Sequence, residues 1–216
     1  MNILKNKGSR DRVSETVSSR IKNPELVRKK HLLIAKKATK LFIKKGYHQT
    51  TMREISKATG MAIGNLYDYI SKKEDVLCLV FDVYHQYVEE YLENNEMLDA
   101  EDPKRELELF IRGALQNVAA FRDEIVLMYR ESKLLPKENM ERAMKKELAQ
   151  IQTLERILKK GIDQGVFHIK DPYFAASMIF YQLIFSTLRG WTFKGKYSDE
   201  AVNHLIQEYI LNSYNS

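Results

Sequence analysis

The sequence predicts an all-α protein in which a short N-terminal helix-turn-helix segment is followed by a larger helical domain. Apolar residues recur every three to four positions rather than every second one, as at Leu107, Phe110, Ala114 and Val118. Helix-start signals punctuate the chain, and no segment alternates as a strand does. With 44% hydrophobic and 30% charged residues, nine Gly and four Pro, the composition is that of a globular protein and excludes a fibrous or disordered chain.

Five helix starts follow from capping residues. Three of them pair an N-cap side chain with a proline at the first helical position, where the missing N–H costs nothing. These pairs are Asn23-Pro24, Asp102-Pro103 and Asp171-Pro172. Thr51 and Ser71 each precede a glutamate by three residues, the spacing of a reciprocal capping box. The expected helices span about 24–45, 52–59, 63–69, 72–94, 103–120, 122–134, 137–163, 172–193 and 198–213.

Charge is divided unevenly along the chain. Residues 1–75 hold 18 Lys or Arg against 7 Asp or Glu, a balance of +11, whereas residues 76–216 hold 17 against 22, a balance of −5. Residues 1–23 lack an apolar period, which predicts a flexible basic arm. A basic front of this size attracts polyanions through counterion release, so a nucleic acid or an anionic membrane surface is favoured as partner.

Several protein classes are excluded by what the chain lacks. The longest uninterrupted apolar stretch, Val76–Phe81, has six residues, far below the roughly 20 that cross a bilayer. The first twenty residues hold no secretory apolar segment, and the single cysteine, Cys78, cannot form an internal disulfide. No phosphate-binding loop or nucleophile elbow is present. We therefore expect a cytoplasmic protein that is neither an enzyme nor membrane-bound and that needs no cofactor.

Residues 24–75 predict a helix-turn-helix domain, and residues 76–216 form the larger domain. A long helix precedes two short ones joined by the tight connection 58–62, where Gly60 supplies a turn conformation that other residues reach only with strain. Ile55 and Leu66 would pack the short pair onto the long helix. The second short helix is then free to enter a DNA major groove.

Two segments resemble a known family. Residues 46–56 (GYHQTTMREIS) and 66–76 (LYDYISKKEDV), with the Thr59-Gly60 turn between them, resemble the TetR family of bacterial transcription regulators over roughly residues 26–77. Ala62 stands where the family often has Ser, so a hydroxyl cap is missing. Ile70 stands where Phe is usual and exchanges one core side chain for another.

The resemblance implies which residues touch double-stranded DNA. Asn65 is the candidate for reading a base, because its amide can pair twice with adenine, although such a residue can also be simply solvated. Ile63 would contact a thymine methyl or else pack on the first helix. Phenol groups and the Lys73 charge would position the protein on phosphates. The expected DNA-contacting residues are Thr51, Arg53, Ile63, Gly64, Asn65, Tyr67, Tyr69 and Lys73.

The larger domain is expected, from the resemblance, to bind a small effector. An excess of Tyr and Met favours a roomy apolar pocket, although the same side chains serve an ordinary core. The expected pocket residues are Tyr84, Tyr87, Tyr91, Phe110, Phe121, Met128 and Tyr129. Residues 158–167 and 171–176 resemble those of many such regulators, including acyl-CoA-sensing ones, so a fatty-acyl effector is one candidate.

The last two helices carry more apolar surface than one outer layer needs. In the TetR family they form a two-fold four-helix interface; burial inside the monomer is the alternative. The expected interface residues are Phe174, Met178, Phe185, Val202, Leu205, Ile206 and Tyr209. Dimerisation would space two heads about 34–36 Å apart, as a near-palindromic site requires.

The sequence therefore favours a homodimeric, ligand-responsive regulator of transcription, in the first place a repressor. A DNA-binding architectural or cell-division factor with the same head and no effector is the alternative, and a membrane-surface protein is a more distant one. Asp82, His85 and Glu89 share one helix face, a spacing that suits either a polar cluster or a metal ion. We assign no metal.

Overall fold

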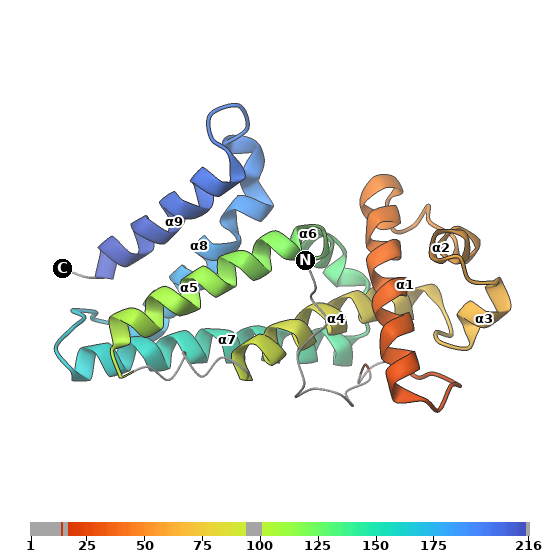
Figure 1. Ribbon diagram of the computed structural model, residues 1–216, viewed down its shortest axis with the longest axis horizontal. Coiled ribbons are helices and arrows are strands. Elements are labelled where there is room, and N and C mark those ends of the chain that lie inside the picture. The colour runs from red at the N-terminus through yellow and green to blue at the C-terminus, as the bar shows by residue number, and fades with distance from the viewer. Residues whose placement is uncertain (1–13, 15–16, 94–100, 215–216) are drawn as a thin grey trace. The chain divides into compact units, whose positions relative to one another are not determined.

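The computed structural model describes residue 14, residues 17–93 and residues 101–214. The chain forms two compact units. Unit 1 comprises residues 1–94 and 123–143, and unit 2 comprises residues 95–122 and 144–216. Every regular element in the described ranges is a helix, which confirms the all-α prediction (Figure 1).

Unit 1 begins with a three-helix head. α1 (Pro24–Lys45) is capped by Asn23, whose side chain accepts a hydrogen bond from the Leu26 N–H at 3.0 Å. α2 (Met52–Thr59) and α3 (Ile63–Tyr67) follow, with the turn at residues 60–62 between them. α1 packs against α2 and α4, and α2 packs against α3 (Figure 1).

The head has an apolar core of its own. Ile34, Ala38 and Phe42 of α1 are fully buried, as are Ile55 of α2 and Leu66 of α3. The α1 residues are four positions apart and form one stripe, so a single face of α1 supplies its share of this core. Each large side chain buried in this way stabilises the fold by about 1.5–3 kcal/mol.

The rest of unit 1 comes from α4 and from segments that return later in the chain. α4 (Lys73–Glu93) is followed in this unit by α6 (Arg122–Glu131), the 3₁₀ turn η2 (Ser132–Leu134) and the start of α7 (Lys137–Asp163). The Asn139 side chain on α7 donates to the Cys78 sulfur on α4 at 2.9 Å. Burial raises the pKa of Cys78 to about 11, so the thiol is protonated at neutral pH. The compact unit thus holds the head together with these later segments, and the 24–75 domain stays a prediction.

Unit 2 holds α5 (Pro103–Ala120), the larger part of α7, α8 (Pro172–Arg189), the 3₁₀ turn η3 (Gly190–Thr192) and α9 (Asp199–Tyr214). α5 packs against α8 and α9, which also pack against each other. Glu106 is fully buried, and its carboxylate pairs with Arg156 at 2.8 Å and Lys160 at 3.1 Å. The two cations supply the pairing that a carboxylate removed from water requires.

The predicted helix starts agree closely with the structure, and the ends agree less well. α3 stops at Tyr67 rather than 69, and the predicted helices 122–134 and 172–193 each finish as a 3₁₀ turn. At the start of α4 the predicted Ser71–Glu74 capping box is replaced by Asp75. The Asp75 carboxylate accepts from the N–H groups of Ser71 and Lys72 at 2.9 and 3.0 Å, and α4 therefore begins at Lys73.

No helix in the described ranges combines the length and the apolar character needed to span a bilayer.

Candidate nucleic-acid interface

The turn between α2 and α3 is closed by local hydrogen bonds. Gly60 adopts the left-handed conformation, with φ 70° and ψ 16°, which a β-carbon would disfavour. The Ser56 hydroxyl donates to the Met61 carbonyl at 2.5 Å, and the Met61 N–H donates to the Ser56 carbonyl at 3.2 Å. The Thr59 hydroxyl contacts the Ile55 carbonyl at 3.0 Å. These bonds set the direction in which α3 leaves α2.

α3 presents a contiguous exposed face. Ile63, Gly64, Asn65 and Tyr67 are exposed, whereas Leu66 between them is fully buried. Ile63 keeps 39% and Tyr67 40% of its surface open to solvent. A short helix anchored by one core residue and otherwise open has the form of a helix-turn-helix recognition helix.

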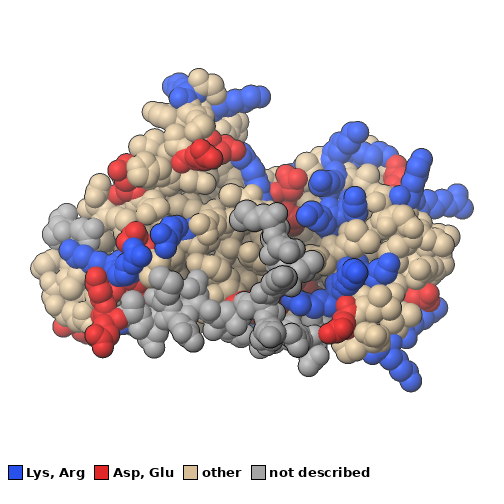
Figure 2. Space-filling view, viewed as in Figure 1, with Lys and Arg blue, Asp and Glu red and all other residues tan. Residues whose placement is uncertain are grey.

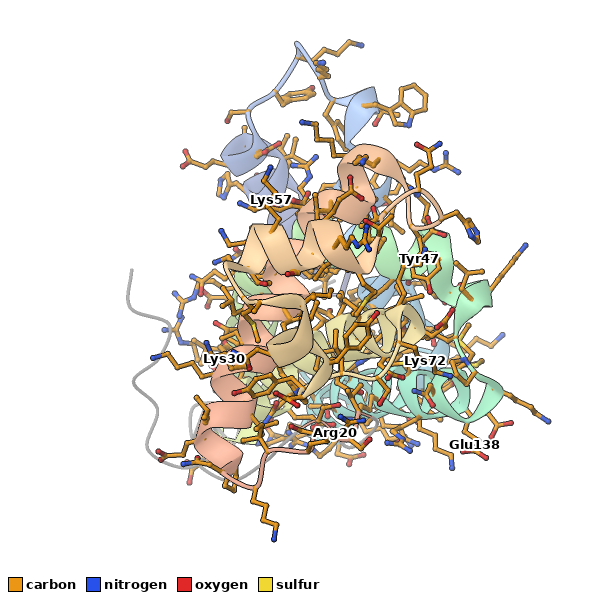
Figure 3. All side chains as sticks on the ribbon, turned by 90° about the vertical axis from the view of Figure 1, so that its right-hand side faces the viewer. Arg20, Lys30, Tyr47, Lys57, Lys72 and Glu138 are labelled. Atoms are coloured by element: carbon orange, nitrogen blue, oxygen red, sulfur yellow. The ribbon has the colours of Figure 1, made fainter. Side chains whose placement is uncertain are left out.

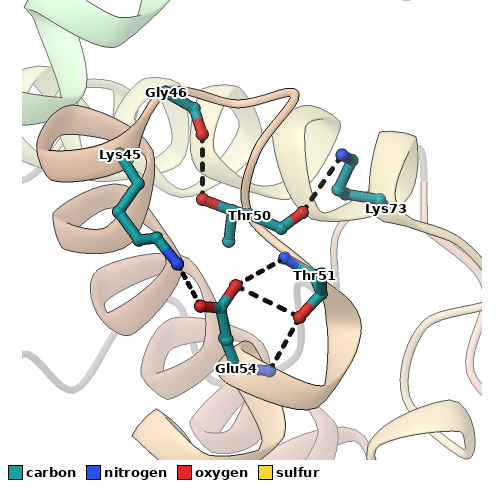
Figure 4. Close-up of polar contacts among 6 residues, drawn as sticks. All are labelled: Lys45, Gly46, Thr50, Thr51, Glu54 and Lys73. Carbon is teal, nitrogen blue, oxygen red and sulfur yellow. Dashed lines mark hydrogen bonds and ion pairs between the residues drawn. The ribbon is translucent and has the colours of Figure 1, made fainter.

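The start of α2 is fastened to the end of α1. Thr51 is the N-cap of α2 and forms the predicted capping box with Glu54, while Arg53 is exposed. Glu54 also pairs with Lys45, the last residue of α1 (Figure 4). The Lys45 contact, followed by the bonds from Thr51, lowers the pKa of the Glu54 carboxyl from 4.5 to about 2. The carboxylate is therefore ionised at neutral pH.

Two of the expected DNA-contacting residues lie behind α3. Tyr69 is only 4% exposed, and its carbonyl accepts a hydrogen bond from the His31 Nε2 at 2.8 Å. The Lys73 ammonium donates to backbone carbonyls between α1 and α2, among them that of Thr50 (Figure 4). Direct contact of Tyr69 or Lys73 with DNA stays a prediction.

Cations gather over the head. Figure 2 shows Lys and Arg side chains projecting around the part of the molecule that α1–α3 form. Figure 3 looks at the head from its end, with Lys57 on α2 and Lys72 just before α4. The exposed cations are Arg20, Lys22, Lys29, Lys36, Lys37, Lys40, Lys44, Lys45, Arg53, Lys57 and Lys72. Such a surface favours duplex DNA, because each phosphate it neutralises releases counterions.

The described residues just before α1 bond to the head. The Ser19 hydroxyl and the Arg20 N–H both donate to the Asp68 carbonyl, at 3.0 and 2.8 Å. Val17 is buried, and the Ser14 hydroxyl donates to the Asp82 carboxylate. Residues 1–13 and 15–16 of the predicted arm lie outside the described residues. The bonds from Ser19 and Arg20 use a backbone carbonyl, so the sequence carries no signal for those two.

The predicted effector residues are divided between the two units. Those of unit 1 are the buried Tyr84 and Met128, the half-buried Tyr87 and Tyr91, and the exposed Tyr129. Those of unit 2 are the buried Phe110 and the half-buried Phe121. A hollow on α7 in unit 2 is lined by residues with polar or charged ends, such as Gln152, Glu155 and Lys159. A shared apolar pocket stays a prediction.

The predicted metal alternative finds no support in geometry. His85 is buried and its Nδ1 donates to the Phe81 carbonyl at 2.9 Å, which turns that nitrogen toward its own helix. Across the described ranges, no group of three His, Cys, Asp or Glu side chains is arranged to hold a metal ion.

α8 and α9 expose a broad apolar face within unit 2. Phe174 and Tyr209 keep 64% and 65% of their surface open. The other exposed members of the predicted interface are Met178, Phe185 and Leu205, and Ile206 is half-buried. Val202 differs, because it is only 4% exposed and belongs to the core of the unit. Tyr173, Tyr181 and Trp191 extend the exposed aromatic surface.

The head has three helices, an open recognition helix and a cationic surface, and a second helical unit accompanies it. These features define a helix-turn-helix DNA-binding regulator of transcription. The chain belongs to the TetR family. Residues 34–78 match the family described as "Bacterial regulatory proteins, tetR family", and residues 100–214 match "Tetracyclin repressor-like, C-terminal domain". The resemblance inferred from residues 46–56 and 66–76 is confirmed.

Two curated relatives are regulators by name. The "Fatty acid metabolism regulator protein" of Bacillus subtilis (strain 168) is 28% identical over 192 residues, which cover 85% of this chain and 95% of that protein. The "HTH-type transcriptional regulator HbdR" of Aromatoleum sp. (strain CIB) is 32% identical over 126 residues, 56% of this chain. The match covers 53% of HbdR, about half its length.

Solved structures share the fold. The TetR family transcriptional regulator PfmR from Thermus thermophilus superposes with a TM-score of 0.72 at 25% identity, covering 83% of this chain and 97% of PfmR. AibR in complex with isovaleryl coenzyme A and operator DNA superposes with a TM-score of 0.70 at 21% identity, covering 86% of this chain and 97% of AibR. The predicted architecture of an N-terminal helix-turn-helix and a helical C-terminal domain is confirmed.

Proposed function

We propose that the protein is a homodimeric repressor that binds a near-palindromic operator through α3 of each protomer and is released by a small apolar effector. The observation that carries the proposal is the open face of α3, where Ile63, Asn65 and Tyr67 surround the anchored Leu66. From this position the side chains reach base edges and phosphates while the head stays folded. The place of action is then the cytoplasm, where the DNA lies.

The roles on α3 follow from side-chain chemistry. Asn65 pairs with adenine through its amide, and Ile63 contacts a thymine methyl. Gly64 allows close approach to the backbone, and the Tyr67 hydroxyl donates to a phosphate oxygen. Arg53 and Thr51 contact phosphates from the start of α2.

The exposed apolar face of α8 and α9 supports the homodimer. Side chains as large as Phe174 and Tyr209, more than half open to water, are typical of surfaces that a partner covers. A second copy of the chain covers this face in a two-fold arrangement, which also supplies the second reading head.

We infer that the apolar part of the effector is a fatty-acyl chain, which an acyl-CoA thioester would supply. The Bacillus subtilis relative is named a fatty acid metabolism regulator, and AibR was solved with isovaleryl coenzyme A and operator DNA. The effector releases the operator only to the extent that it binds the released conformer more tightly.

Selection from a random duplex pool with the full-length protein tests the proposal. We expect an enriched site with two inverted half-sites, protected as one footprint. Acyl-CoAs of increasing chain length should then release the labelled site, whereas free coenzyme A should not. A footprint that no acyl-CoA alters would favour the alternative, an architectural factor without an effector.

A further inference from the structure

The ammonium group of Lys73 is held by the connection between α1 and α2. Its Nζ lies 3.0 Å from the Tyr47 carbonyl, 3.2 Å from the His48 carbonyl and 3.1 Å from the Thr50 carbonyl. The same Nζ lies 4.5 Å from the centre of the Tyr47 ring. A lysine ammonium has three N–H donors, and three carbonyl oxygens are in place to receive them.

The carbonyls that Lys73 binds belong to the segment that starts α2. Thr50 directly precedes Thr51, the N-cap of α2. The Tyr47 ring packs against Phe42 of α1, with ring centres 5.2 Å apart. Lys73 is the first residue of α4, so its side chain ties the first turn of α4 to the end of α1 and the beginning of α2.

We propose that Lys73 is a positioning residue for DNA binding: it holds the α1–α2 connection on α4 and thereby sets where α2 and α3 stand at the operator. The inference rests on the proposed reading of DNA by α3. Hydrogen bonds from an ionised donor are stronger than neutral ones, and the Tyr47 ring adds a cation–π attraction. The link therefore carries any movement of the first turn of α4 directly to α2.

This role differs from the phosphate contact that the family resemblance implies for Lys73. To reach a phosphate oxygen, the ammonium would have to leave at least one of its carbonyl partners. A phosphate contact releases counterions and contributes about 0.9 to the slope of log K against log salt concentration. A positioning residue contributes to affinity without contributing to that slope.

Lys73→Met tests the inference, because methionine keeps the apolar stem and removes the ammonium. The binding probe is the duplex selected by the wild-type protein, measured between low and moderate salt. We expect affinity to fall about tenfold, as for the loss of charge-assisted hydrogen bonds. The salt slope should stay that of the wild type, and the amides of residues 50–54 should exchange faster with deuterium.

Lys72→Met is the matched control. Lys72 is the exposed neighbour of Lys73, so the change removes the same charge without touching the carbonyls. It should leave the exchange rates of residues 50–54 unchanged. A Lys73→Met variant whose slope falls by about 0.9 with unchanged exchange would overturn the inference. Unchanged affinity together with unchanged exchange would overturn it equally.

A second variant covers the case in which Lys73→Met fails to fold. Tyr47→Leu leaves the Lys73 charge in place and removes the ring beneath it, together with the contact of that ring with Phe42. We expect this variant to bind the operator more weakly, with an unchanged salt slope and with faster deuterium exchange at residues 50–54. If its affinity and its exchange rates equal those of the wild-type protein, the inference is contradicted. If the wild-type protein enriches no DNA sequence, the proposed operator binding fails, while exchange at residues 50–54 still tests the link itself.

Discussion

Thr51 and Glu54 bond to each other in both directions across the first turn of α2. The Thr51 N–H donates to the Glu54 carboxylate at 2.9 Å, and the Glu54 N–H donates to the Thr51 hydroxyl oxygen at 3.3 Å (Figure 4). Two N–H groups that a helix start leaves unsatisfied are thereby satisfied within one turn. The same turn carries Arg53, so the fixed geometry also orients a proposed phosphate contact.

Thr51→Ala should destabilise the protein by about 1 kcal/mol, because the N-cap oxygen is lost. Urea denaturation followed by circular dichroism measures the change. Ser71→Ala is the control, because a capping box was predicted at Ser71 as well. There the Asp75 carboxylate accepts from the Ser71 backbone N–H, a bond that the loss of the Ser71 hydroxyl leaves in place. Equal losses in the two variants would contradict the role assigned to the Thr51 box.

The Glu54 carboxyl should make stability depend on pH in the acid range. Its pKa is lowered to about 2 in the folded protein, chiefly by Lys45, so the folded state binds fewer protons than the unfolded state. The stabilisation is present above pH 4.5 and is lost as the pH falls toward 2. NMR titration of the carboxyl measures this directly. Lys45→Met should return the pKa toward its ordinary value, and a titration unchanged by that substitution would contradict the assignment.

His31 should add a second pH dependence at milder acidity. Burial lowers the pKa of its imidazole below 6.5, although the hydrogen bond to the Tyr69 carbonyl and the Asp82 charge oppose the shift. The unfolded state therefore binds more protons below pH 6.5, and stability falls as the pH decreases from there. The free energy of unfolding of wild type should drop more steeply below this pH than that of His31→Gln. Parallel pH profiles for the two proteins would refute the prediction.

Asn65→Ala should relax preference at one base pair of the operator, with a loss of about 1–3 kcal/mol against the preferred base. Competition with operators substituted at each position measures the preference. Tyr67→Phe is the companion variant, because it removes a proposed phosphate contact and should weaken all duplexes alike. Uniform weakening by Asn65→Ala would count against base reading.

Arginine on the exposed face of α8 and α9 should separate the proposed dimer. Phe174→Arg and Tyr209→Arg place charge where both side chains are more than half open, so each protomer should still fold. Sedimentation velocity should show a shift to monomer, and operator affinity should fall with it. Gln116→Arg adds the same charge at an exposed position of α5 and should leave the sedimentation unchanged. A dimer that survives both substitutions would exclude this face.

The helix starts were predictable because their signals are local. Asp102 and Asp171 each cap a helix within three residues, and Thr51 closes its box over the same distance. Gly60 marks its turn through a conformation that other residues avoid. Where the determinant is a short segment of chain, the sequence displays it in full.

The contacts that depend on distant parts of the chain were not predictable in this way. Lys73 donates to carbonyls 23 to 26 positions earlier in the chain. In the sequence alone, a lysine that makes such contacts looks the same as a lysine exposed to solvent. Val202 fits the apolar pattern of a surface helix as well as that of a core helix, and packing within unit 2 decides between them. Ser19 and Arg20 bind a backbone carbonyl, which is the same for every residue type.

The makeup of unit 1 has a consequence for any attempt to isolate the DNA-reading part. The chain leaves this unit near residue 94, re-enters it at 123 and leaves again inside α7, after residue 143. A polypeptide cut after α4 would lack the segment that supplies Asn139 to Cys78 and the buried side chains of α6. The compact unit that contains the head is therefore discontinuous in sequence, and no single cut in the chain would release it intact.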